Sequence, residues 1–389
     1  MDNKINIQDI KSLKEAVLKN KRVFIRMDYN VPVTDNKVTD SYKIQSSFST
    51  IKDVYKQKPS CIIIGSHLGR PKGKYESEYS CRPVYNVLVK MVEESFNEKL
   101  SFCNIEEYKE DKIVFVENLR FYPEEQSEYG DDNKILSTFF EKHVDIVVID
   151  AFGVLHRNDF SVTKTNLPSY AGNLVIKELD VGLEISSTGV DLLILGGSKI
   201  QDKISILETL VPKCKSVFVV GALACSFLKY HFRIETGESK VEEGASDSIK
   251  KIYELSEKFN VKIYISHDYK IQHGDKLYYS CDIPRDGRVV DIGPKTLEQI
   301  RDVIKKSKVI FWNGPPGIFE IEDCSAGTKQ LVGVLSRHIN KVVVGGGETA
   351  ASVRKFSSTD QFYHVSTGGG SFLKFLGGNN LPGLDVLKK

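Results

Sequence analysis

The sequence predicts an α/β protein with two doubly wound parallel sheets, one in each half of the chain, joined by a helical hinge. Short runs rich in Val and Ile alternate with longer amphipathic stretches, which is typical of parallel strands with crossover helices. The runs are almost continuously apolar, which indicates sheets covered on both faces. A length of 389 residues favours two domains over a single core.

The expected elements alternate in the same way in both halves. In the first half, the strands are residues 23–27, 61–65, 112–116 and 146–150, with helices at 46–57, 82–96 and 133–144. In the second half, the strands are residues 192–196, 216–221, 261–266, 308–312 and 341–346, with helices at 246–259 and 296–307. Rossmann-like sheets of this kind bind ligands beyond the carboxyl ends of their strands.

The segment 166–189 connects the two halves. Pro168 and Gly172 mark its start, and the apolar residues that follow have the spacing of an amphipathic helix. Both a hinge and a rigid linker are consistent with this pattern. We therefore expect an N-terminal domain at 1–172, a connecting helix at 173–189, a C-terminal domain at 190–378 and a tail at 379–389. The turn-rich segment 273–293 is expected to form a short β excursion.

Composition excludes several classes of protein. The formal net charge of +2 gives no electrostatic case for a nucleic-acid or membrane partner. No window is apolar enough for a membrane span, and the polar N-terminal segment has no signal-peptide core. The seven cysteines are scattered without a CxxC pair, which predicts neither disulfides nor a zinc site. We expect a cytoplasmic protein with reduced cysteines.

In the first half, cations follow the apolar runs by a few residues. They are Arg26, His67, Arg70, Arg120, His156 and Arg157. Gathered cations repel one another unless an anion compensates them, so their positions predict a site for a small polyanion. Asp28 and Asn30 could bind a hydroxyl beside that anion, although Asp28 could instead pair with Arg26. The two histidines could be general bases or neutral hydrogen-bond donors.

In the second half, glycines take the place of the cations. The chain has no GxxxxGK[ST] motif, and no GxGxxG follows its first strand. Gly345, Gly346 and Gly347 precede a predicted helix, where free N–H groups and the helix dipole favour phosphate, although such a turn can also be purely structural. Lys199 and Lys203 would share one helix face if a helix opens there. Glu348 offers a hard oxygen ligand for Mg²⁺.

Taken in order, these stretches closely resemble the phosphoglycerate kinase family. The motifs SHLGRP, WNGPPGIFE and STGGG are the most specific, and VENLRFYPEE, LGGSKIQDKI, DIGPKT and GGGET lie between or beside them. The resemblance implies a glycolytic kinase that reversibly transfers a phosphoryl group from 1,3-bisphosphoglycerate to MgADP, giving 3-phosphoglycerate and ATP, by in-line transfer after hinge closure. It also implies that the N-terminal domain binds the phosphoglycerate, that the C-terminal domain binds the nucleotide, and that the tail returns to the N-terminal domain.

The resemblance also implies residue roles. The substrate-binding residues would be Arg26, Asp28, Asn30, Lys43, His67, Arg70, Arg120, His156 and Arg157. The nucleotide-binding residues would be Gly196, Gly197, Lys199, Lys203, Gly221, Asn313, Pro315, Gly317, Glu320, Gly345, Gly346, Gly347, Glu348 and Thr349. The catalytic residues would be Lys199, Lys43, Gly347 and Gly370, and Glu348 would hold the Mg²⁺.

Four residues depart from the family pattern. Lys43 stands where the family has a catalytic arginine, Asp159 replaces a cation beside the basic patch, Glu348 replaces an aspartate and Ala222 replaces a glycine. Lysine lacks the planar fork of arginine, and an unpaired Asp159 would oppose a substrate anion. A catalytically weakened nucleotide-binding scaffold is therefore an alternative, and the α/β topology alone also allows a nicotinamide-dependent oxidoreductase. No heptad or long apolar stripe demands a partner, so we expect a monomer.

Overall fold

The computed structural model describes residues 6–126 and 134–389 and divides into two compact units. Unit 1 comprises the residues up to Asp180 together with Asn380–Lys389, and unit 2 comprises Val181–Asn379. The boundary between them lies within helix α5 (Asn173–Thr188), in the segment for which the sequence predicts a connecting helix.

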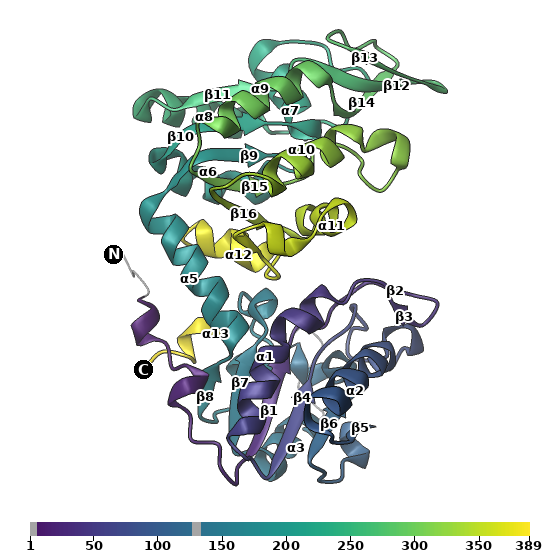
Figure 1. Ribbon diagram of the computed structural model, residues 1–389, viewed down its shortest axis with the longest axis vertical. Coiled ribbons are helices and arrows are strands. Elements are labelled where there is room, and N and C mark those ends of the chain that lie inside the picture. Colours follow the sequence, from purple (N-terminus) through teal and green to yellow (C-terminus); the bar gives the residue numbers. More distant parts are fainter. Residues whose placement is uncertain (1–5, 127–133) are drawn as a thin grey trace. The chain divides into compact units, whose positions relative to one another are not determined.

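The centre of unit 1 is a six-stranded parallel sheet with the order β5-β6-β4-β1-β7-β8 (Figure 1). Its strands are β1 (Arg22–Met27), β4 (Cys61–Gly65), β5 (Leu100–Cys103), β6 (Ile113–Val116), β7 (Ile146–Asp150) and β8 (Ser169–Ala171). Every residue of β4 and β7 is buried, as expected for a sheet covered on both faces. The strand order reverses between β1 and β7, and ligands of such sheets bind beyond the carboxyl ends at the reversal.

The helices of unit 1 are α1 (Tyr42–Lys56), α2 (Arg82–Phe96), α3 (Ile135–His143), α4 (Phe160–Thr163) and α13 (Pro382–Asp385). In α1 the buried residues Ile44, Phe48 and Ile51 form an apolar stripe at helical spacing. The first three helices coincide with predicted ones, although α1 begins earlier, and residue 133 of the third prediction lies outside the described residues. A short hairpin joins β2 (Val33–Thr34) to β3 (Lys37–Val38).

The C-terminal segment is held in unit 1 by backbone hydrogen bonds. The N–H of Gly383 donates to the carbonyl of Leu155 at 2.8 Å, and the N–H of Lys11 donates to the carbonyl of Leu387 at 2.7 Å. The last residues of the chain therefore contribute to the N-terminal unit.

Unit 2 contains a second six-stranded parallel sheet, with the order β11-β10-β9-β15-β16-β17 (Figure 1). Its strands are β9 (Val190–Leu195), β10 (Cys214–Val219), β11 (Lys262–Ile265), β15 (Val309–Asn313), β16 (Lys341–Gly345) and β17 (His364–Val365). Its helices are α6 (Ile204–Leu210), α7 (Gly221–Phe227), α8 (Ser246–Phe259), α9 (Pro294–Lys305), α10 (Ala326–Ser336), α11 (Gly347–Phe356) and α12 (Gly370–Leu376). The fold class predicted from the sequence, with two parallel-sheet α/β domains, is confirmed.

The predicted β excursion is a small antiparallel sheet in unit 2. It consists of β12 (Tyr269–His273), β13 (Lys276–Ser280) and β14 (Gly287–Ile292), in the order β13-β12-β14. The last strand, β14, leads directly into α9 through Gly293.

The start of α5 is fixed by a buried aspartate at the end of β7. Oδ1 of Asp150 accepts hydrogen bonds from the N–H groups of Leu174 at 2.9 Å and Val175 at 3.2 Å, whereas Oδ2 has no hydrogen-bond partner among the described residues. A Cβ at Gly172 would lie 2.3 Å from Oδ1, so only glycine allows this approach. Burial raises the pKa of Asp150 to about 6.

Asp150→Asn is expected to gain stability relative to the wild type as the pH rises. Because the folded-state pKa lies above the unfolded value, the stabilising effect of the protonated form is lost as the pH rises through about 6. Asparagine keeps an oxygen for the two N–H groups and carries no charge at any pH. Urea unfolding at pH 5 and pH 8 should show the stability difference changing by about 1–1.5 kcal/mol. Equal pH dependence of the two proteins would contradict this assignment.

Candidate functional site

Arg26, in β1, lies beneath the surface of unit 1. Its side chain is fully buried, with Nη2 3.1 Å from Oε1 of Glu125 and Nε donating to Oγ of Ser161 at 2.7 Å. The guanidinium also donates to the carbonyl of Met27. Glu125 in turn accepts from the N–H of Ser161 at 3.0 Å. The side chains of Arg26 and Glu125 therefore connect β1, the η6 turn (Pro123–Glu125) and α4.

Asp159 lies between two buried arginines. Its Oδ2 is 3.7 Å from Nη2 of Arg26 and 3.7 Å from Nη2 of Arg120. The sequence predicts that this carboxylate opposes an anion unless a cation pairs with it, and the structure provides two such cations. Arg120 and Asp159 are each close to full burial.

Arg120 retains unused hydrogen-bonding capacity. Its Nη1 donates to the carbonyl of Gly69 at 2.9 Å, but Nε and Nη2 are buried without a hydrogen-bond acceptor among the described residues. Burial lowers the pKa of Arg120 to about 10, so the group remains a cation at neutral pH. Buried donors without an acceptor are rare in proteins, and a bound anion would satisfy them.

Lys43, Asp28 and His67 form a second group at the end of β1. Nζ of Lys43, from the first turn of α1, lies 2.8 Å from Oδ2 of Asp28, and Nε2 of His67 lies 3.9 Å from Oδ1. Burial raises the pKa of Asp28, but Lys43 and Arg26 lower it below its ordinary value overall. Burial and the neighbouring cations hold the pKa of His67 well below 6.5. His67 is therefore a neutral imidazole at pH 7, which favours a hydrogen-bonding role over that of a charged patch residue.

The remaining predicted residues of unit 1 lie nearer the surface. Oδ1 of Asn30 accepts from the N–H of Gly69 at 3.0 Å, which joins the loop after β1 to the loop after β4. Arg70 is exposed and Arg157 is half-buried, and neither guanidinium has a hydrogen-bond acceptor within the described part of the chain. His156 is half-buried and already has an interaction partner.

In unit 2, the loops after β9 and β15 interlock through backbone hydrogen bonds. The N–H of Gly196 donates to the carbonyl of Asn313 at 2.8 Å, and the N–H of Gly197 donates to the carbonyl of Pro315 at 3.2 Å. A Cβ at Gly196 would lie 2.4 Å from the carbonyl oxygen of Gly314. Gly221, with a φ of +64°, opens α7 against Pro316 in the same way. These glycines bring the loops after β9, β10 and β15 close together at the carboxyl edge of the sheet.

The triple glycine after β16 opens a helix, as predicted. Gly346 has a φ of +92°, and α11 begins at Gly347. A Cβ built on Gly347, Gly369 or Gly370 would meet nothing within 4 Å, so the backbone there faces open space. The first N–H groups of a helix have no intrahelical acceptor, and together with the helix dipole they attract phosphate.

Asn313 and Thr349 hold this glycine loop in place. Nδ2 of Asn313 donates to the carbonyl of Gly345 at 2.8 Å, and Oγ1 of Thr349 accepts from the N–H of Gly314 at 2.7 Å. Oδ1 of Asn313 is buried without a hydrogen-bond donor in the described ranges. Oδ1 of Asn313 is therefore a free hydrogen-bond acceptor, among the described residues, beside the open glycine backbone.

The expectation for Lys199 and Lys203 needs correction. The two lysines would share one helix face if a helix opened at this loop, but the helical chain begins only at the η9 turn (Gln201–Lys203), after Lys199. Lys203 is buried, and its Nζ folds back to donate to the carbonyl of Lys199 at 3.0 Å. Lys199 itself is exposed.

The comparisons with known proteins agree with this geometry. The family model described as phosphoglycerate kinase matches residues 13–379. The chain belongs to the phosphoglycerate kinase family. The phosphoglycerate kinase of Yarrowia lipolytica is 36% identical to this chain, over 97% of this chain and 98% of that protein. The phosphoglycerate kinase of Leptospira biflexa is 37% identical, over 96% of this chain and 97% of that protein.

Two solved structures are similar along nearly the whole chain. The phosphoglycerate kinase of Coxiella burnetii superimposes with a TM-score of 0.79 at 32% identity, covering 97% of this chain and 98% of that one. The enzyme of Pyrococcus horikoshii gives a TM-score of 0.81 at 25% identity, with the same coverage. These matches make the chain a glycolytic kinase, a phosphotransferase with a carboxyl group as acceptor, and they disfavour the weakened scaffold.

The metal expected in a phosphoglycerate kinase would depend on few protein ligands. Glu348 is exposed in the first turn of α11, beside the open glycine backbone. The described residues contain no cluster of three or more acidic, histidine or cysteine side chains suited to a metal ion. Mg²⁺ commonly binds through one or two carboxylates together with substrate phosphates, so a single carboxylate at this position fits a nucleotide-borne ion.

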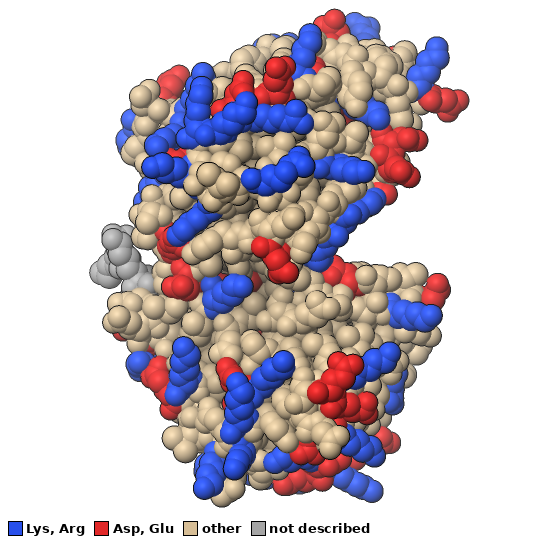
Figure 2. Space-filling model, in the orientation of Figure 1, with Lys and Arg blue, Asp and Glu red and all other residues tan. Residues whose placement is uncertain are grey.

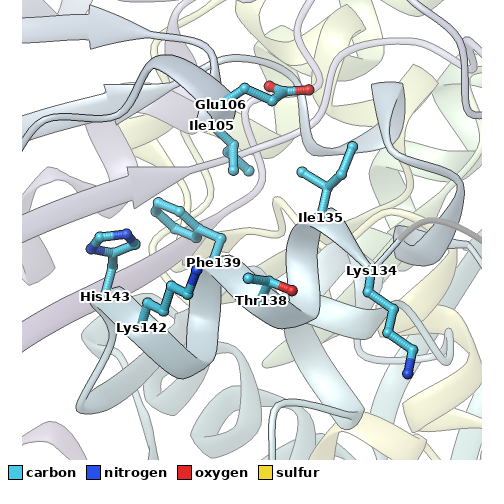
Figure 3. Close-up of a pocket in the computed structure, with 8 residues that line it drawn as sticks. All are labelled: Ile105, Glu106, Lys134, Ile135, Thr138, Phe139, Lys142 and His143. Carbon is cyan, nitrogen blue, oxygen red and sulfur yellow. The ribbon is translucent and has the colours of Figure 1, made fainter.

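A pocket in unit 1 lies away from the predicted site of this phosphoglycerate kinase relative. A pocket of about 420 Å³ lies against α3, lined by Ile105, Phe139 and His143 among others, and contains none of the predicted site residues (Figure 3). Figure 2 shows side chains of both charges interspersed over the visible face. None of the helices in the described ranges is both long and apolar enough to cross a membrane.

Sequence reasoning missed two residues that hold the loop at Gly317, Asp291 and Thr328. Both lie close to Gly317, and Oγ1 of Thr328 accepts from its N–H at 2.9 Å. The only sign of Asp291 in the sequence is that the family motif DIGPKT begins with it. The motif by itself indicates no role for this aspartate.

Proposed function

We propose that unit 1 binds 3-phosphoglycerate or 1,3-bisphosphoglycerate, that unit 2 binds MgADP or MgATP, and that the phosphoryl group passes reversibly between them. The observation that supports this most is the contrast between two anion-binding edges. In unit 1, buried Arg120 has donors without acceptors among the described residues, and within those residues neither Arg70 nor Arg157 has an ion-pair partner. In unit 2, glycine backbone faces open space at Gly347 and Gly370.

In the acid site, we assign direct contact with substrate anions to Arg70, Arg120 and Arg157. Asp28 and Asn30 would bind the substrate hydroxyl, and neutral His67 would donate or accept a hydrogen bond. Arg26 is fully buried, so we propose that it acts through Asp159 by holding Arg120 in place. His156 completes the surroundings of the patch.

In the nucleotide site, we assign the adenosine to the loops at Gly196, Gly197, Gly221, Pro315 and Gly317, with exposed Glu320 near the ribose. The phosphates would lie against Asn313 and the residues from Gly345 to Thr349. Lys203 would bind the phosphate chain, although its Nζ must then share its donors with the carbonyl of Lys199. Glu348 would hold the Mg²⁺, whose charge neutralises the phosphates when it is bound.

The chemistry needs no general base. The attacking carboxylate has an ordinary pKa near 4 and is already ionised at neutral pH. What the protein supplies is in-line positioning and cations around the transferring phosphoryl group. We assign these cations to Lys199 and Lys43, with backbone N–H groups of Gly347 and Gly370. Because the two ligands must meet in a site without water, we propose that transfer follows closure about α5.

A coupled assay tests this function directly. The purified protein with MgATP should phosphorylate 3-phosphoglycerate at a rate that saturates with both substrates. Calorimetry should show binding of ADP but not of NAD. Absence of turnover at saturating MgATP, with ADP binding intact, would favour the scaffold instead. Light scattering tests the further expectation of a monomer. Cell fractionation tests the expectation of a cytoplasmic protein, which the seven unpaired cysteines support.

Lys43→Arg is expected to raise kcat by roughly tenfold at most, which corresponds to about 1.4 kcal/mol. Nζ of Lys43 is engaged with Asp28 at 2.8 Å, and a guanidinium could keep that contact while directing a second N–H at the substrate. Steady-state kinetics with both substrates saturating measure the effect. Lys43→Met, which loses the cation, should be slower than the wild type. If the arginine variant is no faster, Lys43 does not stand in the catalytic position.

A further inference from the structure

Asp291 is a buried carboxylate next to the proposed adenosine loop. It lies near the end of β14, and its side chain is fully buried. Oδ2 accepts from the N–H of Gly327 at 2.6 Å, and Oδ1 accepts from the N–H of Ile292 at 2.9 Å. The carboxylate therefore binds the first turn of α10 with one oxygen and its own strand with the other.

The same carboxylate packs directly against the backbone of Gly317. A Cβ on Gly317 would lie 2.4 Å from both Cγ and Oδ1 of Asp291. From the other side, Oγ1 of Thr328 in α10 accepts from the N–H of Gly317 at 2.9 Å. The next residue, Ile318, donates its N–H to the carbonyl of Val290 at 2.9 Å. Gly317 is thus held between β14 and the start of α10.

We propose that Asp291 is a positioning residue which, through the first turn of α10 and Thr328, fixes the Pro315–Gly317 loop and so sets the affinity for the nucleotide. This inference rests on the proposed function, because it takes Gly317 as part of the adenosine site. It assigns no contact between Asp291 and the nucleotide, since the carboxylate lies beneath the loop. The binding of the acid substrate, in unit 1, should be unaffected.

The charge of Asp291 supplies a distinguishing signature. Burial raises the pKa of Asp291 to about 7, while hydrogen bonds from Ile292, Gly327 and Thr328 and the charge of Lys270 on β12 lower it. Cys324 of the η12 turn (Glu322–Cys324) lies near this carboxyl group, and the charges of Lys270, Asp323 and Arg288 also act on Cys324. Below pH 7 the protonated group is a weaker acceptor for these N–H groups. The loop should therefore be held less firmly at pH 6 than at pH 8.

Asp291→Asn tests the proposal because asparagine keeps the shape of the side chain but replaces one acceptor oxygen with an NH₂ group. One of the backbone N–H groups of Gly327 and Ile292 then loses its acceptor. We expect the Kd for MgADP and the KM for MgATP to rise about fivefold to tenfold, with the KM for 3-phosphoglycerate changing less than twofold. Between pH 6 and pH 8, the Kd for MgADP should fall about threefold further in the wild type than in the variant. This comparison cancels the titration of the nucleotide itself.

Thr328→Val and Thr328→Ser form a matched pair. They test the same proposal independently if Asp291→Asn folds poorly. Valine removes the acceptor for the N–H of Gly317 and should raise the Kd for MgADP, whereas serine keeps the hydroxyl and should restore wild-type affinity. Unchanged ADP affinity in Asp291→Asn and Thr328→Val, with an active wild type, would overturn the proposal. An equal rise in both substrate KM values would also overturn it. A wild type that neither binds ADP nor turns over would refute the proposed function instead.

Discussion

Lys199→Met should lower kcat by about 10²–10³-fold, the usual effect of removing one preorganised donor from a transition state. Lys199 follows the Gly196–Gly197 turn at the carboxyl end of β9, and its exposed side chain has no ion-pair partner among the described residues. Its ammonium is therefore available to the phosphoryl group in transfer. The KM for MgATP should change much less, because Lys203 and the glycine backbone at Gly347 remain.

Steady-state kinetics with both substrates varied separate these two effects. Lys258→Met is a suitable control, since Lys258 is also an exposed lysine of unit 2 but lies in the last turn of α8. The control should keep wild-type kinetics. If Lys199→Met raises the KM for MgATP and leaves kcat intact, Lys199 binds the nucleotide without acting in the transfer.

Arg26→Met should destabilise the protein by about 3–5 kcal/mol, because breaking a buried ion pair leaves an uncompensated charge. Arg26 and Glu125 are both fully buried, with Nη2 3.1 Å from Oε1, and Asp159 shares the same guanidinium. Burial already raises the pKa of Glu125. Methionine fills a similar volume but leaves this carboxylate without its cation.

Denaturant unfolding at pH 7 measures the loss, and the double variant Arg26→Met/Glu125→Gln provides the control. Removing both charges should recover a clear part of the lost stability, while Asp159 remains paired with Arg120. If the double variant is no more stable than Arg26→Met, the destabilisation comes from packing and not from charge. Turnover should fall in both variants. Asp159, which holds Arg120, has lost its contact with Arg26 in each of them.

Most of the architecture follows from local sequence. Continuous Val and Ile runs such as 61–65 and 146–150 predict buried parallel strands, and the structure has β4 and β7 there with every residue buried. The glycines before residue 348 predict a helix start, and α11 begins at Gly347. These predictions succeed because strand burial and helix starts depend on residues that are neighbours in the chain.

Side-chain partners were less predictable. Sequence alone suggested that Asp28 could pair with Arg26, but Lys43 on α1 is the closer partner. It also allowed Lys199 and Lys203 to share one helix face if a helix opened there, whereas the helical chain begins only at Gln201. Asp291 was not singled out, because an aspartate before Ile-Gly-Pro gives no local sign that a distant glycine will pack against it.

By itself, the sequence determined two α/β halves, cations at the strand ends of one and glycines at those of the other, and the family. Only the tertiary structure decided which of those cations can meet a ligand. Arg26, near the end of β1, and Arg120, after β6, are both buried, yet Arg26 is bound by Glu125 and Ser161, while Arg120 keeps two donors without acceptors among the described residues. The physical reason is that a buried charge is defined by its nearest partners, and here those partners come from segments far away in the chain.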